Sequence, residues 1–186
     1  MSTSKTPPAK NPGTGASAGE ERAGSVQAGG MADEVLERVA RSARGAGVFG
    51  DVALAPGRVA AAARDSAEPA FYRVEAAGPG AAAVSLVTPA RYLSQSIEAD
   101  LVHTGDKLDD LLADELIDQG YSGPALRVEH YRDTEKLFTF RSRVELFGAD
   151  RTPLTSDAAA RRLTQILLAY EACFRPLGDM EAGEEE

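Results

Sequence analysis

The residues best suited to chemistry lie together at positions 103–106, His-Thr-Gly-Asp, between two predicted helices. The imidazole of His103 can exchange a proton near neutral pH or bind a metal ion, and the carboxylate of Asp106 can assist in either role. Gly105 would let a ligand approach the backbone closely because it has no side chain. This grouping indicates, as one hypothesis, a metal-dependent hydrolase-type enzyme with its site around His103 and Asp106.

A structural role explains the same residues and is the interpretation we favour. Gly105 breaks the chain between the helices, and Asp106 caps the N-terminus of the second helix. The carboxylates that follow then lie opposite a leucine stripe, on a solvated or partner-facing surface (Asp109, Asp110, Asp114). We therefore expect no catalytic residue and no cofactor, with His103 and Asp106 as the candidates for metal ligands.

Two other side chains have reactive chemistry. His130 is expected near the end of a strand, partly buried and with its hydrogen bonds satisfied. Whether it meets His103 in space is left open. Cys173 falls beside the apolar stripe of the last predicted helix and is expected to act as a small buried apolar residue. The sequence has no Gly-x-Ser-x-Gly motif for a serine nucleophile.

Composition excludes several functional classes. The 186 residues carry 29 acidic and 20 basic side chains, and the resulting net charge of -9 opposes binding to nucleic acid. One cysteine rules out an internal disulfide, and no apolar run is long enough to span a bilayer. Because the N-terminus also lacks the apolar region of a secretory signal, we expect no membrane association and a cytoplasmic location.

The chain divides into one domain with two polar ends. Residues 1–30 are rich in Ser, Thr, Gly, Ala and Pro, and they are expected to be disordered because they cannot bury enough apolar surface to offset the ordering entropy. Residues 179–186 are expected to form an acidic, disordered tail. Residues 31–178 have the apolar patterning of a single domain.

Apolar periodicity predicts the elements of this domain. They are a helix over residues 32–43, strands over 48–54, 71–75 and 83–87, helices starting at Thr88-Pro89 and at Asp106, a hairpin after Gly123-Pro124, and a final helix from Thr155 or Ser156 to Phe174. Residues 58–64 suit either a strand or a helix. This order predicts an α+β fold, with an antiparallel sheet of two hairpin-containing halves and helices packed on one face.

The second hairpin has a predictable register. Pairing Val128 with Phe138 and Leu126 with Phe140 places all four side chains on one face and leaves residues 131–135 as a loop. The opposite face would carry a mixed-charge surface that can suit an acidic partner (Arg127, Glu129, Arg141, Arg143, Glu145).

A second apolar face is predicted at the end of the chain. Leu168 lies off the main stripe of the final helix, and Leu177 lies beyond it. Such residues either pack on another element or form a dimer contact. Together with Asp109, Asp110 and Asp114 they make the predicted partner surface.

The C-terminal third carries a recognisable pattern. It consists of the strand Leu137-Phe138-Thr139-Phe140-Arg141-Ser142, a loop, and a capped amphipathic helix that ends Tyr170-Glu171-Ala172-Cys173-Phe174. In this pattern the chain resembles the YbjN-like proteins and the related type III secretion chaperones of bacteria. The resemblance implies a small, acidic, non-enzymatic protein that dimerises or holds a partner chain. We therefore expect a protein-binding or chaperone-like module.

Overall fold

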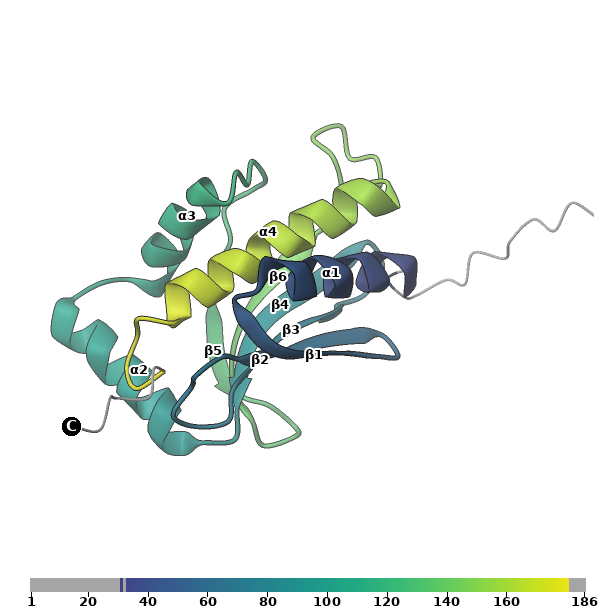
Figure 1. The fold of residues 1–186 in the computed structure, drawn as a ribbon. Helices are drawn as coiled ribbons and strands as arrows, with labels where there is room; N and C mark the ends of the chain where they lie inside the picture. The colour runs from purple at the N-terminus through teal and green to yellow at the C-terminus, as the bar shows by residue number, and fades with distance from the viewer. Residues whose placement is uncertain (1–30, 32, 181–186) are drawn as a thin grey trace, which may run out of the picture.

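The computed structural model describes residue 31 and residues 33–180, which form a six-stranded antiparallel sheet with four helices (Figure 1). The strands lie in the order β1-β2-β3-β4-β6-β5, so pairing of β4 with β6 joins the two predicted halves into one sheet. The predicted α+β class is thereby confirmed. Residues 1–30 and 181–186, which fall in the segments predicted to be disordered, lie outside the described residues.

The observed elements follow the predicted order. They are α1 (Asp33–Ala46), β1 (Phe49–Ala55), β2 (Arg58–Ala63), β3 (Phe71–Ala76), β4 (Ala81–Thr88), α2 (Arg91–Thr104), α3 (Leu108–Asp118), β5 (Glu129–Arg132), β6 (Phe138–Glu145) and α4 (Ser156–Phe174). The open choice at residues 58–64 is settled as strand β2, because this segment pairs with β1 on one side and β3 on the other. Among the helices of residues 33–180, none combines the length and hydropathy of a membrane span.

Two helices cover one face of the sheet. α1 contacts β1 and β2, α4 contacts β3 and β4, and α3 packs on α4; Figure 1 shows α1 and α4 together across this face. Alternate strand residues face these helices and are buried (Val59, Ala61, Tyr72, Val74, Val84, Leu86, Phe140, Val144). The predicted stripe of α4 meets them, also fully buried (Leu163, Ile166, Leu167, Tyr170, Phe174).

The register of the second hairpin differs from the prediction. His130 pairs with Phe140 and Arg132 with Phe138, so Phe138 has a partner four positions beyond the predicted Val128. An even shift keeps every side chain on its own face. The alternation of apolar residues therefore could not distinguish the two registers.

Turn chemistry sets the observed register. Asp133 and Leu137 close the turn, since the Asp133 N–H donates to the Leu137 carbonyl and the Leu137 N–H donates to Asp133 Oδ1 at 2.8 Å. Lys136 adopts φ +65°, the left-handed conformation that ends a three-residue hairpin loop. The connection is therefore residues 133–137 rather than residues 131–135.

Both predicted helix caps in the middle of the chain are wrong. Thr88 is the last residue of β4, where its hydroxyl donates to the Pro69 carbonyl, and α2 begins three residues later. The cap position of α3 is Lys107, and the exposed Asp106 does not cap it. In each case a preceding strand or loop extends further than local preference indicates. Of the two predicted caps of α4, Thr155 and Ser156, the structure selects Thr155, because its side chain accepts from the Ala158 N–H.

The end of the described chain packs against α2. The Gly178 N–H donates to Asp100 Oδ2 at 3.2 Å, the Asp179 N–H donates to Ser96 Oγ at 3.1 Å, and Met180 is buried. Gly178 has φ +55°, and a Cβ there would lie 2.6 Å from the Ile97 nitrogen, so glycine is required for this approach. Packing thus extends two residues past the predicted domain end at residue 178.

Candidate functional site

The predicted metal ligands His103 and Asp106 are both exposed. His103 lines a shallow hollow of about 550 Å³ with Tyr92 and Asp100, and Gly105 caps α2 with φ +80°. In the part of the chain that the structure describes, no group of three or more His, Cys, Asp or Glu side chains could hold a metal ion. The observed role of residues 103–106 is to end one helix and lead into the next.

The structure places His130 against α2. Its Nε2 lies 3.1 Å from Ser94 Oγ, and its Nδ1 lies 3.4 Å from Glu98 Oε1. The imidazole ring also stacks on Phe140, with 4.0 Å between ring centroids. His103 follows Ser94 by nine residues, which at about 100° per residue puts it on the opposite side of the helix. The two histidines therefore face away from each other.

Ser94, His130 and Glu98 have the residue types of a nucleophilic triad. Ser94 is 0% exposed, however, so its hydroxyl is closed to a substrate. Burial lowers the pKa of His130, while the charge of Glu98 acts in the opposite direction. We therefore interpret these three residues as a structural contact, the His130 latch, that holds α2 on the β5–β6 hairpin.

The predicted partner surface is divided by the fold. Leu177 is 8% exposed and belongs to the core, and Leu168 is partly buried against it. Of the two alternatives that the sequence left open, packing within the chain is therefore observed for Leu177. Asp109 accepts a hydrogen bond from the Val128 N–H at 2.8 Å, whereas Asp110 and Asp114 are exposed.

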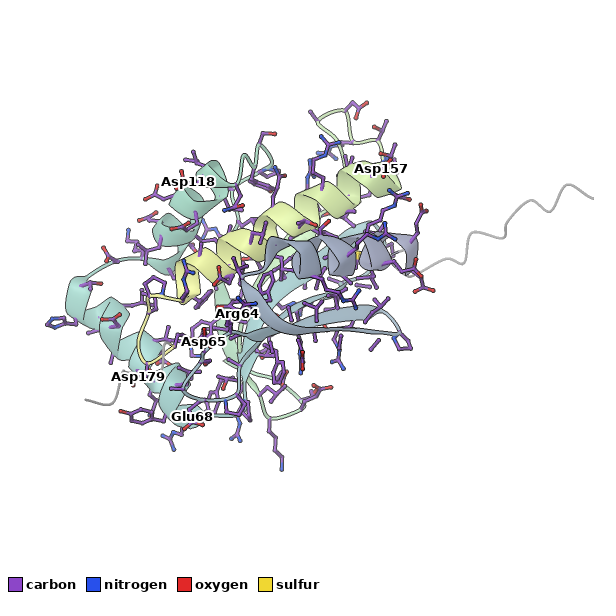
Figure 2. All side chains as sticks on the ribbon, viewed as in Figure 1. Arg64, Asp65, Glu68, Asp118, Asp157 and Asp179 are labelled. Carbon is purple, nitrogen blue, oxygen red and sulfur yellow. The ribbon has the colours of Figure 1, made fainter. Side chains whose placement is uncertain are left out.

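Acidic side chains occur at several separate places on the surface. Figure 2 shows Asp118 on α3, Asp157 at the start of α4 and Asp179 beside α2, well separated from one another. Asp157 pairs with Arg38 of α1. The net negative charge thus marks no single acidic docking face among these labelled positions.

The face of the sheet opposite α1 and α4, here called the open face, carries a groove along β4. Its floor is made of two small side chains at alternate positions of β4, each 2% exposed (Ser85 and Val87). Of the registered neighbours on β3 and β6, four line the cavity and form its two walls (Arg73 and Glu75; Thr139 and Arg141).

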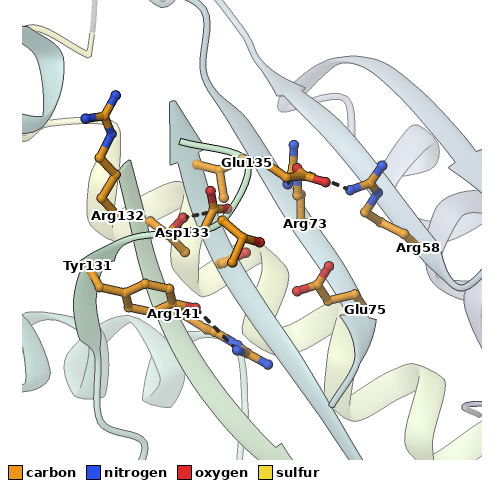
Figure 3. A pocket seen from close by; sticks show the side chains of 12 residues that line it. Arg58, Arg73, Glu75, Tyr131, Arg132, Asp133, Glu135 and Arg141 are labelled. Atoms are coloured by element: carbon orange, nitrogen blue, oxygen red, sulfur yellow. Dashed lines mark hydrogen bonds and ion pairs between the residues drawn. The ribbon is translucent and has the colours of Figure 1, made fainter. Parts of the chain in front are cut away.

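A cavity of about 480 Å³ lies over this groove (Figure 3). Among its lining residues, Arg73 and Arg141 pair with Ser85 from either side. Arg73 has a side chain only 15% exposed, and its Nη1 lies 3.3 Å from Glu135 Oε2. Arg141 Nη1 donates to the Tyr131 phenol oxygen at 3.3 Å. Among the described residues Arg141 forms no ion pair, and its Nε is buried without a hydrogen-bond partner.

The groove is suited to binding a carboxylate. A guanidinium presents five donors in a planar fork that matches a carboxylate in two-point contact. Arg73 and Arg141 use few of these donors within the chain. Glu75 and Glu135 also line the cavity, so its charge is nearly balanced. Its arginines are therefore interspersed with carboxylates and do not form a broad basic surface.

Sequence reasoning found one wall of this groove. It places Arg141 and Arg143 on the polar face of the second hairpin, and both lie on the open face. Arg127 is assigned to the same face but precedes β5 and lies outside the sheet. Arg58 and Arg73 could not be predicted as part of the site, because each is the one basic residue of its strand. Only sheet pairing brings them beside the second hairpin. Ser94 and Glu98 were likewise missed as partners of His130.

Comparisons with known proteins identify no relative of this chain. No protein-family model, curated protein or solved structure matches the chain. The resemblance to YbjN-like proteins and type III secretion chaperones stays a prediction, and function is inferred from the geometry of the molecule.

Proposed function

We propose that the chain is a non-enzymatic, chaperone-like protein-binding module that holds an extended, acidic segment of a partner protein in the groove of the open face. The observation that carries the proposal is the placement of Arg73 and Arg141 on either side of Ser85, with most of their donors unused. A partner carboxylate between them would meet guanidinium groups from both walls and a hydroxyl from the floor.

The dimensions of the groove suit one extended chain. Its walls stand on β3 and β6, two strand spacings apart, which is roughly 10 Å. The floor from Ser85 to Val87 runs about 7 Å at ~3.3 Å per residue. A helix with its side chains is about 10–12 Å across and would fill the whole width before its residues reached the floor. About three extended residues, by contrast, would lie along β4.

Charge complementarity favours an acidic segment. Alternate residues of an extended chain point the same way, so a carboxylate that faces the floor would meet Arg73 and Arg141. The net charge of -9 repels an acidic partner at long range. Recognition would therefore depend on short-range contact with these arginines.

Peptide binding tests the proposal. The probes are fluorescein-labelled ten-residue peptides of alternating Glu and Ser, with alternating Lys and Ser as the matched control, measured by fluorescence anisotropy. We expect the Glu/Ser peptide to bind more tightly. Arg141→Ala should weaken it about tenfold, since a hydrogen bond to a charged group contributes roughly 1.5 kcal/mol or more.

Arg91→Ala is the matched control variant, because it removes the same charge from an exposed position on α2. It is expected to leave peptide affinity unchanged. Equal affinity for the two peptides, or equal effects of Arg141→Ala and Arg91→Ala, would overturn the proposal. Light scattering on the same samples gives the oligomeric state and tests the expected self-association separately.

A further inference from the structure

The hairpin between β5 and β6 places a carboxylate of the chain itself in the groove. Glu135 Oε2 lies 3.3 Å from Arg73 Nη1 and 4.0 Å from Arg58 Nη1. Figure 3 shows Glu135 reaching from the hairpin toward these two arginines, which stand on other strands. Arg73 and Glu135 are 62 residues apart in the chain, so this contact is made only by the fold.

We infer that Glu135 occupies, within the free protein, the subsite that an acidic side chain of the partner takes in the complex. The hairpin tip is then a built-in competitor that limits affinity and rejects partners without a carboxylate at this point. This inference rests on the proposed function, because it assigns the regulation of the same groove.

The contact of Glu135 with Arg58 and Arg73 is of a kind that a ligand can displace. The Glu135 side chain is 58% exposed, and it reaches each arginine through a single oxygen. Exposed ion pairs of this kind contribute little to stability. Arg73 is mostly buried, so it requires a carboxylate partner, and a partner residue bound through two oxygens would satisfy it better.

The backbone of the hairpin need not move for this exchange. Asp133 holds the turn by accepting hydrogen bonds from the Leu137 N–H at 2.8 Å and from Thr139 Oγ1 at 3.3 Å. The Lys136 N–H also donates to the Asp133 carbonyl at 3.0 Å. Glu135 lies within this closed turn, so rotation of its side chain alone would vacate the subsite.

Removing the charge of Glu135 tests the inference with the same Glu/Ser peptide. Glu135→Gln keeps the size of the side chain, and we expect the peptide to bind about two- to fivefold more tightly, which corresponds to roughly 0.4–1 kcal/mol. Glu37→Gln on the exposed side of α1 makes the same change in net charge and should leave affinity as in the wild type. Thermal unfolding of each variant checks that all are folded.

The possible results separate this inference from the proposed function. If the wild type binds the peptide and Glu135→Gln binds it equally or more weakly, Glu135 is no competitor and the inference is wrong while the proposed function stands. If neither protein binds the Glu/Ser peptide in preference to the Lys/Ser peptide, both are wrong. A gain that Glu37→Gln reproduces would also overturn the inference, since net charge would explain it.

Discussion

The two faces of the sheet are closed by different means. On the covered face, Tyr72, Leu86 and Phe140 are at most 1% exposed beneath the helices. On the open face, Ser85 and Val87 are almost as well buried, at 2% each, yet the cavity above them is lined by strands and the β5–β6 hairpin. Long polar side chains shield these small floor residues with their stems and keep their charged ends at the surface.

The contrast separates stability from recognition. Every residue of β4 is buried. Burial on both faces is typical of a strand that lies between two apolar layers. Only one of those layers is apolar. The other is made of arginine, glutamate and tyrosine side chains that can rearrange around a ligand. We therefore expect substitutions on the covered face to change the free energy of unfolding, and those on the open face to change binding.

The largest effect is expected from shortening Leu86, which is fully buried between its neighbours Tyr72 and Phe140. Leu86→Ala should lower the free energy of unfolding by about 2–5 kcal/mol, because it leaves a cavity in a packed core. Val87→Ala, one residue along and on the open face, should cost about 1–2 kcal/mol, since it removes two methylene equivalents beneath flexible side chains. Urea unfolding followed by circular dichroism measures both values.

Peptide affinity gives the opposite ranking for the same two variants. In the absence of urea, where both variants are folded, Leu86→Ala should bind the Glu/Ser peptide as the wild type does. Val87→Ala alters the floor of the groove and should therefore bind the peptide more weakly. Equal losses of stability in the two variants would mean that the open face is packed like the core, and the contrast between the faces would be lost.

A smaller effect is expected from pH at the His130 latch. Burial lowers the pKa of His130 from its usual 6.5, with Glu98 opposing the shift, so the folded protein takes up this proton less readily than the unfolded chain. The contribution of neutral His130 to the free energy of unfolding is complete above pH 6.5 and is lost as pH falls through the folded-state pKa. The melting temperature should therefore fall from pH 7.5 to pH 5.5 in the wild type, and fall less in His130→Gln.

His103→Gln is the control for this measurement, because it removes the other histidine from an exposed position. It should retain the pH slope of the wild type. A pH slope of the melting temperature that disappears in His103→Gln and persists in His130→Gln would contradict the prediction, because the pH dependence would then not come from His130.

The smallest effect is expected at the helix break. His103→Ala should change the free energy of unfolding by less than about 0.5 kcal/mol, as is usual for a surface substitution. The metal content of the purified protein, measured by mass spectrometry, should be the same in the variant and the wild type. A stoichiometric metal ion that is lost in His103→Ala would instead favour the alternative of a metal-dependent hydrolase.

Local signals predicted most of the fold. The stripe of α4 depends on residues a few positions apart, so periodicity was enough to find it, and the hydroxyl residues before it narrowed the cap to Thr155 or Ser156. The predictions failed where two local solutions were equally good. The hairpin register shifted by an even number of residues, and Thr88 and Asp106 had capping side chains that the observed helix starts do not use.

The candidate site was predicted only in part. The alternation of β6 was enough to put Arg141 and Arg143 on one polar face, and a partner of opposite charge was already suggested there. Arg73 and Glu135 could not be added, because their contact joins residues far apart in sequence through three sheet pairings.

By itself, the sequence determined the α+β class, the order of the elements and which side chains share a face, because backbone preference and alternation act over a few residues. The tertiary structure alone decided which of those faces is covered by helices and which is left open. It also decided that His130 meets Ser94 and that Arg73 faces Arg141 across β4. Strand order and register set these contacts through space, and no short stretch of the chain contains that information.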